Sequence, residues 1–397
     1  MQTSQRQPYL DWLRIIAIIG VLVLHAAMPF ATGEGWHIRN KETSNVLLEL
    51  VHWLHMFRMP LLFFISGAIS YCMLQNRTGA GFIGLRFTRL FIPLLFGMLV
   101  IVPPQVYLER VTNGYKGNFW QFYAHMFTTG PYPKGDISWH HLWFILYLLI
   151  YDIICTPFFT YMVSPASEQL RKRLQWLGQG KRIFLLVTPA VIIYTSMVIQ
   201  FPETNALVGD WCFLLYWLSF LVPGFICMAV PGLMDSLERN RRFSLQLAFI
   251  SLVLVNYVRW NDIEPWDILA NWKTDARTYM YLAARALCGW TWVLAAIGYG
   301  KRYLDRKHRV LDYLNQAVYP FYILHQTVIV ILAFYVVQVP ETVGMKYIFI
   351  FLVTFMISMG IYHLFIRPFT VARFLFGMKP GKRKTVIVPH QKQVQTA

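Results

Sequence analysis

Long apolar runs recur from one end of the chain to the other, separated by short polar and basic segments. Each run approaches the ~20 residues that an α-helix needs to cross the ~30 Å hydrocarbon core of a bilayer. The first run lacks a small-residue cleavage site, so we expect a retained helix rather than a signal peptide. The pattern predicts ten membrane-spanning helices, over residues 10–30, 47–74, 90–108, 141–163, 183–201, 208–230, 243–260, 279–299, 313–337 and 347–366.

The composition agrees with an all-α integral membrane protein. Of the 397 residues, 56% are hydrophobic and only 14% are charged, whereas soluble domains carry about 25% charged residues. The net charge of +17 would suit a nucleic-acid binder, but the basic residues lie between the apolar runs rather than in one patch. We therefore expect membrane lipids, and not nucleic acid, as the partners of these charges.

The basic residues also predict the orientation of the bundle. With the N-terminus in the cytoplasm, the inner segments hold 25 Lys and Arg, the outer loops hold 9, and Arg58 and Arg285 lie within apolar runs. Cytoplasmic loops are enriched in Lys and Arg, so both termini are expected in the cytoplasm. Residues 1–378 are expected to form one membrane domain, and residues 379–397 a basic, disordered tail.

Ionisable residues inside the apolar runs are the candidates for chemistry. A charge near the bilayer centre costs ~2.5–3.5 kcal/mol and is usually kept for a function. Arg14 and His25 are separated by ten residues, which places His25 ~16 Å further along the first helix. His325 stands ten residues after Asn315 in the ninth run, at a similar depth. Two histidines at matching depth suggest one polar site, although a single buried histidine is often only a packing residue.

Arg86 and Arg89 mark the entrance to the third helix. Their i,i+3 spacing places both guanidiniums on one helix face, where the positive end of the helix dipole adds to their attraction for phosphates. An ordinary basic anchor at the cytoplasmic surface is the alternative.

Most of the other histidines map to the outer half, which favours a proton-transfer pocket open to that side. His52 and His55 share a helix face, but no carboxylate or cysteine stands at ligand spacing, so no metal is expected. The motifs of soluble hydrolases, P-loop enzymes and dinucleotide enzymes are missing. The aromatic outer segment 109–140 suits a lid or a sugar-stacking surface, or alternatively an aromatic belt at the headgroups.

Together these features resemble the acyltransferase-3 family of integral membrane acyltransferases, over nearly the whole chain. The matching features are Arg14-x10-His25, Arg86-x-x-Arg89, His141-Leu142-Trp143-Phe144 and the late helix with Tyr319 through His325. Three further stretches are similar to the group of this family that succinylates periplasmic glucans. They are Trp36-His37-Ile38, Phe57-Arg58-Met59 and Gly377-Met378-Lys379-Pro380.

The resemblance implies an acyl donor, a catalytic base and the residues that bind the substrates. Acyl-CoA, as succinyl-CoA or acetyl-CoA, is a donor substrate rather than a resident cofactor, and its phosphates would meet Arg14, Arg86 and Arg89. His25, with His325 as a second catalytic residue, would accept the proton of a sugar hydroxyl. The predicted substrate-binding residues are Arg58 and Arg285, for a succinyl carboxylate, together with His141 and Trp143.

The implied function is transfer of an acyl group, expected to be succinyl, to hydroxyls of a periplasmic glucan, in the inner membrane of a bacterium. One alternative is O-acetylation of another envelope polysaccharide or glycolipid. Another is a transporter or flippase, for which Gly- or Pro-broken helices at matching positions in two halves are expected. Prolines do interrupt the apolar runs, but without such correspondence.

Overall fold

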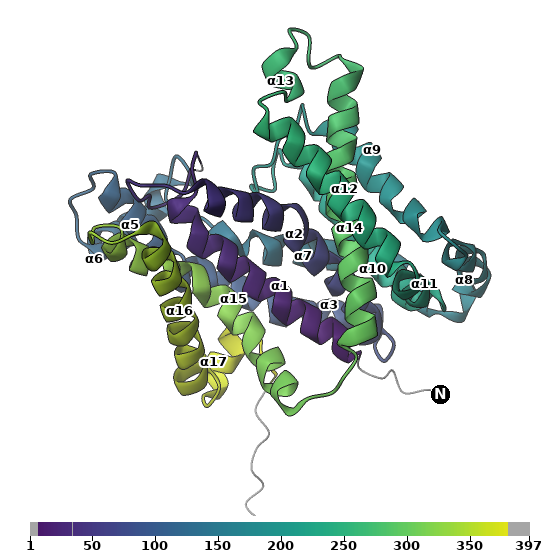
Figure 1. The fold of residues 1–397 in the computed structure, drawn as a ribbon. Coiled ribbons are helices and arrows are strands. Elements are labelled where there is room, and N and C mark those ends of the chain that lie inside the picture. Colours follow the sequence, from purple (N-terminus) through teal and green to yellow (C-terminus); the bar gives the residue numbers. More distant parts are fainter. Residues whose placement is uncertain (1–6, 34, 380–397) are drawn as a thin grey trace, which may run out of the picture.

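The computed structural model describes residues 7–33 and 35–379, and in these ranges the chain forms α-helices joined by loops, with no β-strand (Figure 1). Nine helical segments are long and apolar enough to cross a membrane, and a bent pair of shorter helices makes a tenth candidate. The prediction of an all-α membrane bundle with about ten spans is therefore confirmed. The predicted tail, 379–397, lies outside the described residues from residue 380 onward.

The spans fall into two groups that pack side by side (Figure 1). The first group holds α1 (Pro8–Ala27), α2 (Asn45–Leu74), α3 (Gly79–Arg86), α4 (Ile92–Phe96), α5 (Pro103–Thr112), α7 (Trp143–Val163), α15 (Arg309–Val336) and α16 (Val343–Ile361). The second holds α9 (Thr188–Met197), α10 (Trp211–Ala229), α12 (Arg241–Trp260) and α14 (Ala276–Tyr303). Shorter helices at the ends are α6 (Phe119–Thr129), α8 (Glu168–Leu174), α11 (Leu233–Arg239), α13 (Pro265–Ile268) and α17 (Thr370–Leu375).

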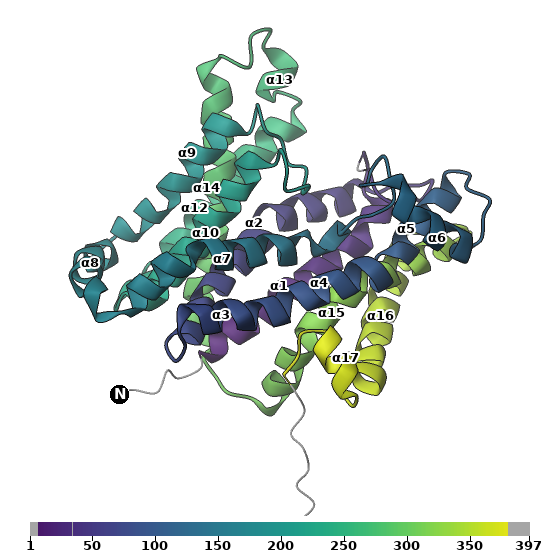
Figure 2. The ribbon, with the colours of Figure 1, turned by 180° about the vertical axis from the view of Figure 1, so that it is seen from behind.

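The third span is longer than its apolar run predicts. It runs from Gly79 to Thr112 as α3, α4 and α5, with π-helical turns between them, and lies alongside α7 (Figure 2). The apolar run predicted a start at residue 90, with Arg86 before the helix. The helix includes Arg86 because the Asp152 carboxylate of α7 pairs with its charge.

The fifth predicted span, 183–201, is instead part of the bent pair. The segments Pro165–Gly178 and Arg182–Met197 meet at 111°, and the break falls at Gly180, whose φ of +55° few side chains adopt. The first of these segments, Pro165–Gly178, contains α8 with its basic residues, and it lies before the apolar run that predicted the span.

Two glycines let the groups approach closely where α2 crosses α10. A Cβ on Gly67 would meet the Leu221 carbonyl of α10, and one on Gly224 would meet the Phe64 carbonyl of α2. Small residues at such crossings allow the backbone contact that drives helix association in lipid. This crossing joins the first group to the second.

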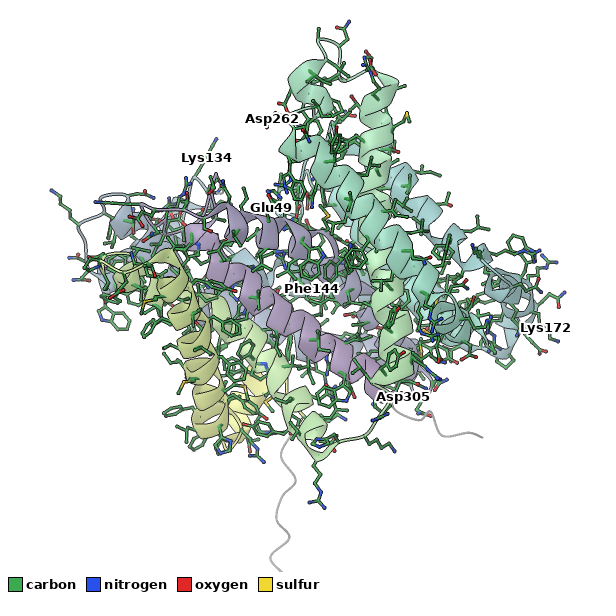
Figure 3. The ribbon with its side chains drawn as sticks, in the orientation of Figure 1. Glu49, Lys134, Phe144, Lys172, Asp262 and Asp305 are labelled. Carbon is green, nitrogen blue, oxygen red and sulfur yellow. The ribbon has the colours of Figure 1, made fainter. Side chains whose placement is uncertain are left out.

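The labelled polar residues of the loops lie in different parts of the bundle (Figure 3). Glu49, Lys134 and Asp262, all expected outside, lie toward the upper part of the view, and Lys172 and Asp305, expected inside, lie at the lower right (Figure 3). Which of these faces meets the cytoplasm stays a prediction.

Candidate active site

His25 of α1 and His325 of α15 meet between their helices. His25 Nδ1 lies 2.9 Å from His325 Nε2, and the two rings are stacked at an interplanar angle of 6° with centroids 5.1 Å apart. The His325 side chain is fully buried. The structure thus brings together the two histidines whose depth matched in the sequence, and we call them the histidine pair.

Hydrogen bonding defines the protonation state of the pair. His325 Nδ1 lies 2.6 Å from the Tyr322 carbonyl oxygen, which can only accept, so this nitrogen carries the proton. His325 Nε2 must then accept from His25 Nδ1–H. In neutral rings this leaves the lone pair of His25 on Nε2, the arrangement required of a general base. The sequence did not show that His325 orients His25.

His141 stands beside the pair, and Trp143 does not. The His141 ring meets the His325 ring edge-on at a centroid distance of 5.2 Å, and its Nε2 donates to the Ile323 carbonyl over 3.0 Å. Trp143 packs in an aromatic cluster against Tyr147 and Trp217. These contacts fix the start of α7 against α15, and the role of both residues toward a substrate stays a prediction.

Of the two arginines within spans, Arg58 is the one whose charge acts on the histidine pair. Arg58 of α2 is 7% exposed and lies within electrostatic range of both His25 and His325. Arg285 of α14 lies instead among tyrosines of the second group, Tyr194, Tyr216 and Tyr281. An anionic group at the histidine pair would therefore be attracted by the charge of Arg58 rather than by that of Arg285.

The arginines predicted to hold acyl-CoA are arranged differently from one another. Arg86 is buried, with its Nε 2.8 Å from Asp152 and its Nη2 donating to Ser70 over 2.6 Å. Arg89 follows one turn later and is half-buried, and Arg14 lies 3.7 Å from Asp11. The Arg86 guanidinium is thus already occupied by Asp152 and Ser70, and the binding of phosphates by these arginines stays a prediction.

A second polar network next to the pair was not found from the sequence. His37 Nδ1 makes a short hydrogen bond to Glu109, and its Nε2 lies 3.3 Å from the Gln326 amide nitrogen. Gln326 donates to Gln105 over 3.2 Å. The sequence did not mark Glu109 as a site residue, because its partner His37 is 72 residues away in the chain.

Tyr132 completes this network by donating to the other Glu109 oxygen over 3.1 Å. Burial and the nearby carboxylate raise the pKa of the Tyr132 phenol to about 12, so it remains a donor at neutral pH. Next to His37, the His140 ring stands edge-on at a centroid distance of 4.6 Å. His37 and His140 thus extend the cluster of imidazoles beyond the pair.

Taken together, the fold and the site define a polytopic helical membrane protein with a half-buried imidazole whose free nitrogen can accept a proton. Among the described residues, no three His, Cys, Asp or Glu side chains gather as a metal site would require. The chain matches the acyltransferase domain family over residues 7–363, and it belongs to that family. It is a membrane acyltransferase.

Curated relatives cover almost the same length. Proteins named glucans biosynthesis protein C from Escherichia coli O1:K1 and from Escherichia coli strain K12 are each 23% identical over 393 residues. The alignments include 95% of this chain and 96% of each relative. No solved structure matches the chain.

Proposed function

We propose that this protein transfers a succinyl group from succinyl-CoA in the cytoplasm to hydroxyl groups of a periplasmic glucan. Family membership supports acyl transfer, and the names of the relatives support a glucan acceptor. The observation that carries the chemistry is the hydrogen bond from His25 to His325, because it leaves His25 Nε2 unprotonated.

In the proposed step, His25 Nε2 takes the proton of the sugar hydroxyl while its oxygen attacks the thioester carbonyl carbon. The new C–O bond forms, the C–S bond breaks, and the proton passes from His25 to the CoA sulfur. His325 holds the ring and accepts from Nδ1–H, so it also steadies the imidazolium that exists between the two proton transfers, as the third member of a catalytic triad does.

The donor would enter from the face that carries Arg14 and Arg89, where a CoA phosphate would meet two cations. Arg86 would support that site indirectly. Its ion pair with Asp152 holds the third span, which carries Arg89, against α7. The acceptor would approach past the imidazoles of His140 and His37. Arg285 and the surrounding tyrosines offer a further polar surface for substrate in the second group.

O-acetylation of another envelope polysaccharide or glycolipid is the second candidate function. The low identity of 23% to the named relatives favours testing it, because the histidine pair serves acetyl and succinyl transfer equally. Donor and acceptor assays separate the two functions.

The first test is label transfer in inside-out membrane vesicles loaded with periplasmic glucan. Wild type, His25→Ala and the exposed control His125→Ala would each receive radiolabelled succinyl-CoA or acetyl-CoA. We expect succinyl label on the glucan, reduced by ~10²- to 10⁴-fold in His25→Ala and unchanged in the control.

Acetyl label alone would favour the second function. Full activity of a stably folded His25→Ala protein would show that the proposed base is wrong.

A further inference from the structure

Arg58 is a buried cation whose guanidinium contacts no carboxylate among the described residues. It is 7% exposed, and it forms no ion pair within the described part of the chain. Its Nε is buried and makes no hydrogen bond to the described residues. A buried guanidinium loses its hydration and is strongly unfavourable unless an anion compensates it. Glu203 acts on this charge only through His55 and at longer range, so the guanidinium still lacks a contacting anion, which a substrate or the reaction can supply.

Two residues of the outer side hold this guanidinium in place. Arg58 Nη1 donates to His55 Nδ1 over 3.4 Å, so the His55 proton lies on Nε2, which donates to Glu203 over 3.4 Å. Burial acts to raise the pKa of the Glu203 carboxyl, but His55 and the Arg58 charge outweigh it and lower the pKa. An ionised carboxylate thus supports His55, and His55 supports Arg58 on its Nη1 side.

The place of Arg58 decides which anion it meets. In acyl transfer, negative charge develops on the oxygen of the carbonyl that the hydroxyl attacks, and a donor must already lie close to that oxygen. The attacked carbon must lie next to the hydroxyl held by His25. The helix of Arg58, α2, packs directly against α1, which carries His25, and the Arg58 charge acts on both histidines of the pair. Arg86 is bound to Asp152 and Arg285 lies in the second group.

We propose that Arg58, positioned by His55 and Glu203, binds the oxyanion that forms on the transferred acyl group. As the hydroxyl oxygen bonds to the carbonyl carbon, the C=O electron pair moves to the oxygen, which accepts a hydrogen bond from the guanidinium. When the C=O bond re-forms, the C–S bond breaks and sulfur takes the proton from His25. Arg58 is unchanged at the end, and the inference rests on the proposed acyl transfer.

This role differs measurably from that of a receptor for the succinyl carboxylate. An oxyanion forms with every acyl donor, whereas acetyl-CoA has no carboxylate to bind. Loss of an oxyanion donor lowers kcat and leaves ground-state binding nearly intact. A carboxylate receptor would mainly change the KM for succinyl-CoA.

The test measures kcat and KM of the full chain in proteoliposomes, with succinyl-CoA and acetyl-CoA. For Arg58→Gln we expect kcat to fall ~10²- to 10³-fold with both donors, with KM changed only a few-fold. Arg58→Lys keeps the charge and should recover part of kcat. Arg277→Gln, which alters an exposed arginine paired with Asp275, is the control and should match wild type.

Glu203→Gln tests the positioning residues and provides a second route if Arg58→Gln does not fold. We expect kcat to fall ~10-fold with both donors, and the fall to vanish in the Arg58→Gln background, because both changes act on one group. An effect confined to succinyl-CoA, or a normal kcat in folded Arg58→Gln, would overturn the inference alone. No transfer from either donor in wild type would overturn the proposed function as well.

Discussion

At the scale of single residues, the orientation of His25 depends on one acceptor nitrogen. His325 Nε2 accepts from His25 Nδ1–H over 2.9 Å, and the Tyr322 carbonyl sets the His325 ring. We expect His325→Leu to lower kcat by ~10²- to 10⁴-fold without raising the KM for acyl-CoA, because the ring and tautomer of His25 are no longer fixed. His325→Gln, which still offers an acceptor oxygen, should recover part of the loss. Equal kcat in His325→Leu and wild type would exclude an orienting role.

Also at the residue scale, the Arg86–Asp152 pair should matter for stability. Asp152 is fully buried and Arg86 is 7% exposed. Asp152→Asn leaves the Arg86 charge buried without its partner, and we expect the free energy of unfolding to fall by about 3–5 kcal/mol. Denaturant unfolding in detergent measures this. The exposed Glu168–Lys172 pair is the matched control, and Glu168→Gln should leave stability unchanged.

At the scale of elements, the crossing of α2 and α10 depends on two missing side chains. We expect Gly67→Leu and Gly224→Leu each to separate the helices and strongly lower the unfolding temperature, since the new side chain meets backbone rather than a movable group. Gly360 of α16 has open space around it, so Gly360→Ala should be neutral or stabilise the helix by up to ~1 kcal/mol. Similar unfolding temperatures for Gly67→Leu and wild type would contradict the close approach.

At the scale of the whole molecule, the orientation in the membrane can be tested by labelling. Lys134 and Lys172 are exposed and lie at opposite ends of the bundle (Figure 3), while four of the five native cysteines are buried. In intact cells, we expect Lys134→Cys to react with a periplasm-accessible, membrane-impermeant thiol reagent. Lys172→Cys should react only after the inner membrane is opened. The reverse pattern would invert the assigned topology.

The amino-acid sequence alone determined the features that are local to a segment. A spanning helix satisfies its backbone hydrogen bonds within itself, so the length of each apolar run was enough to predict most of the spans. The spacing of His25 and His325 along their helices gave their depth for the same reason. The spacing of Arg86 and Arg89 predicted a shared helix face, but not that Arg86 turns toward another helix.

Only the tertiary structure decided which distant residues meet. His25 and His325 are 300 residues apart in the chain, and matching depth does not say whether two helices are neighbours or how they are rotated. The sequence likewise did not show that Asp152 pairs with Arg86. Nor did it show that the charge of Arg58, rather than that of Arg285, acts on the histidine pair. In lipid, helices associate through side-chain fit, as at Gly67 and Gly224, and that fit depends on both partners together. Apolar pattern therefore determined the spans, and packing determined the site.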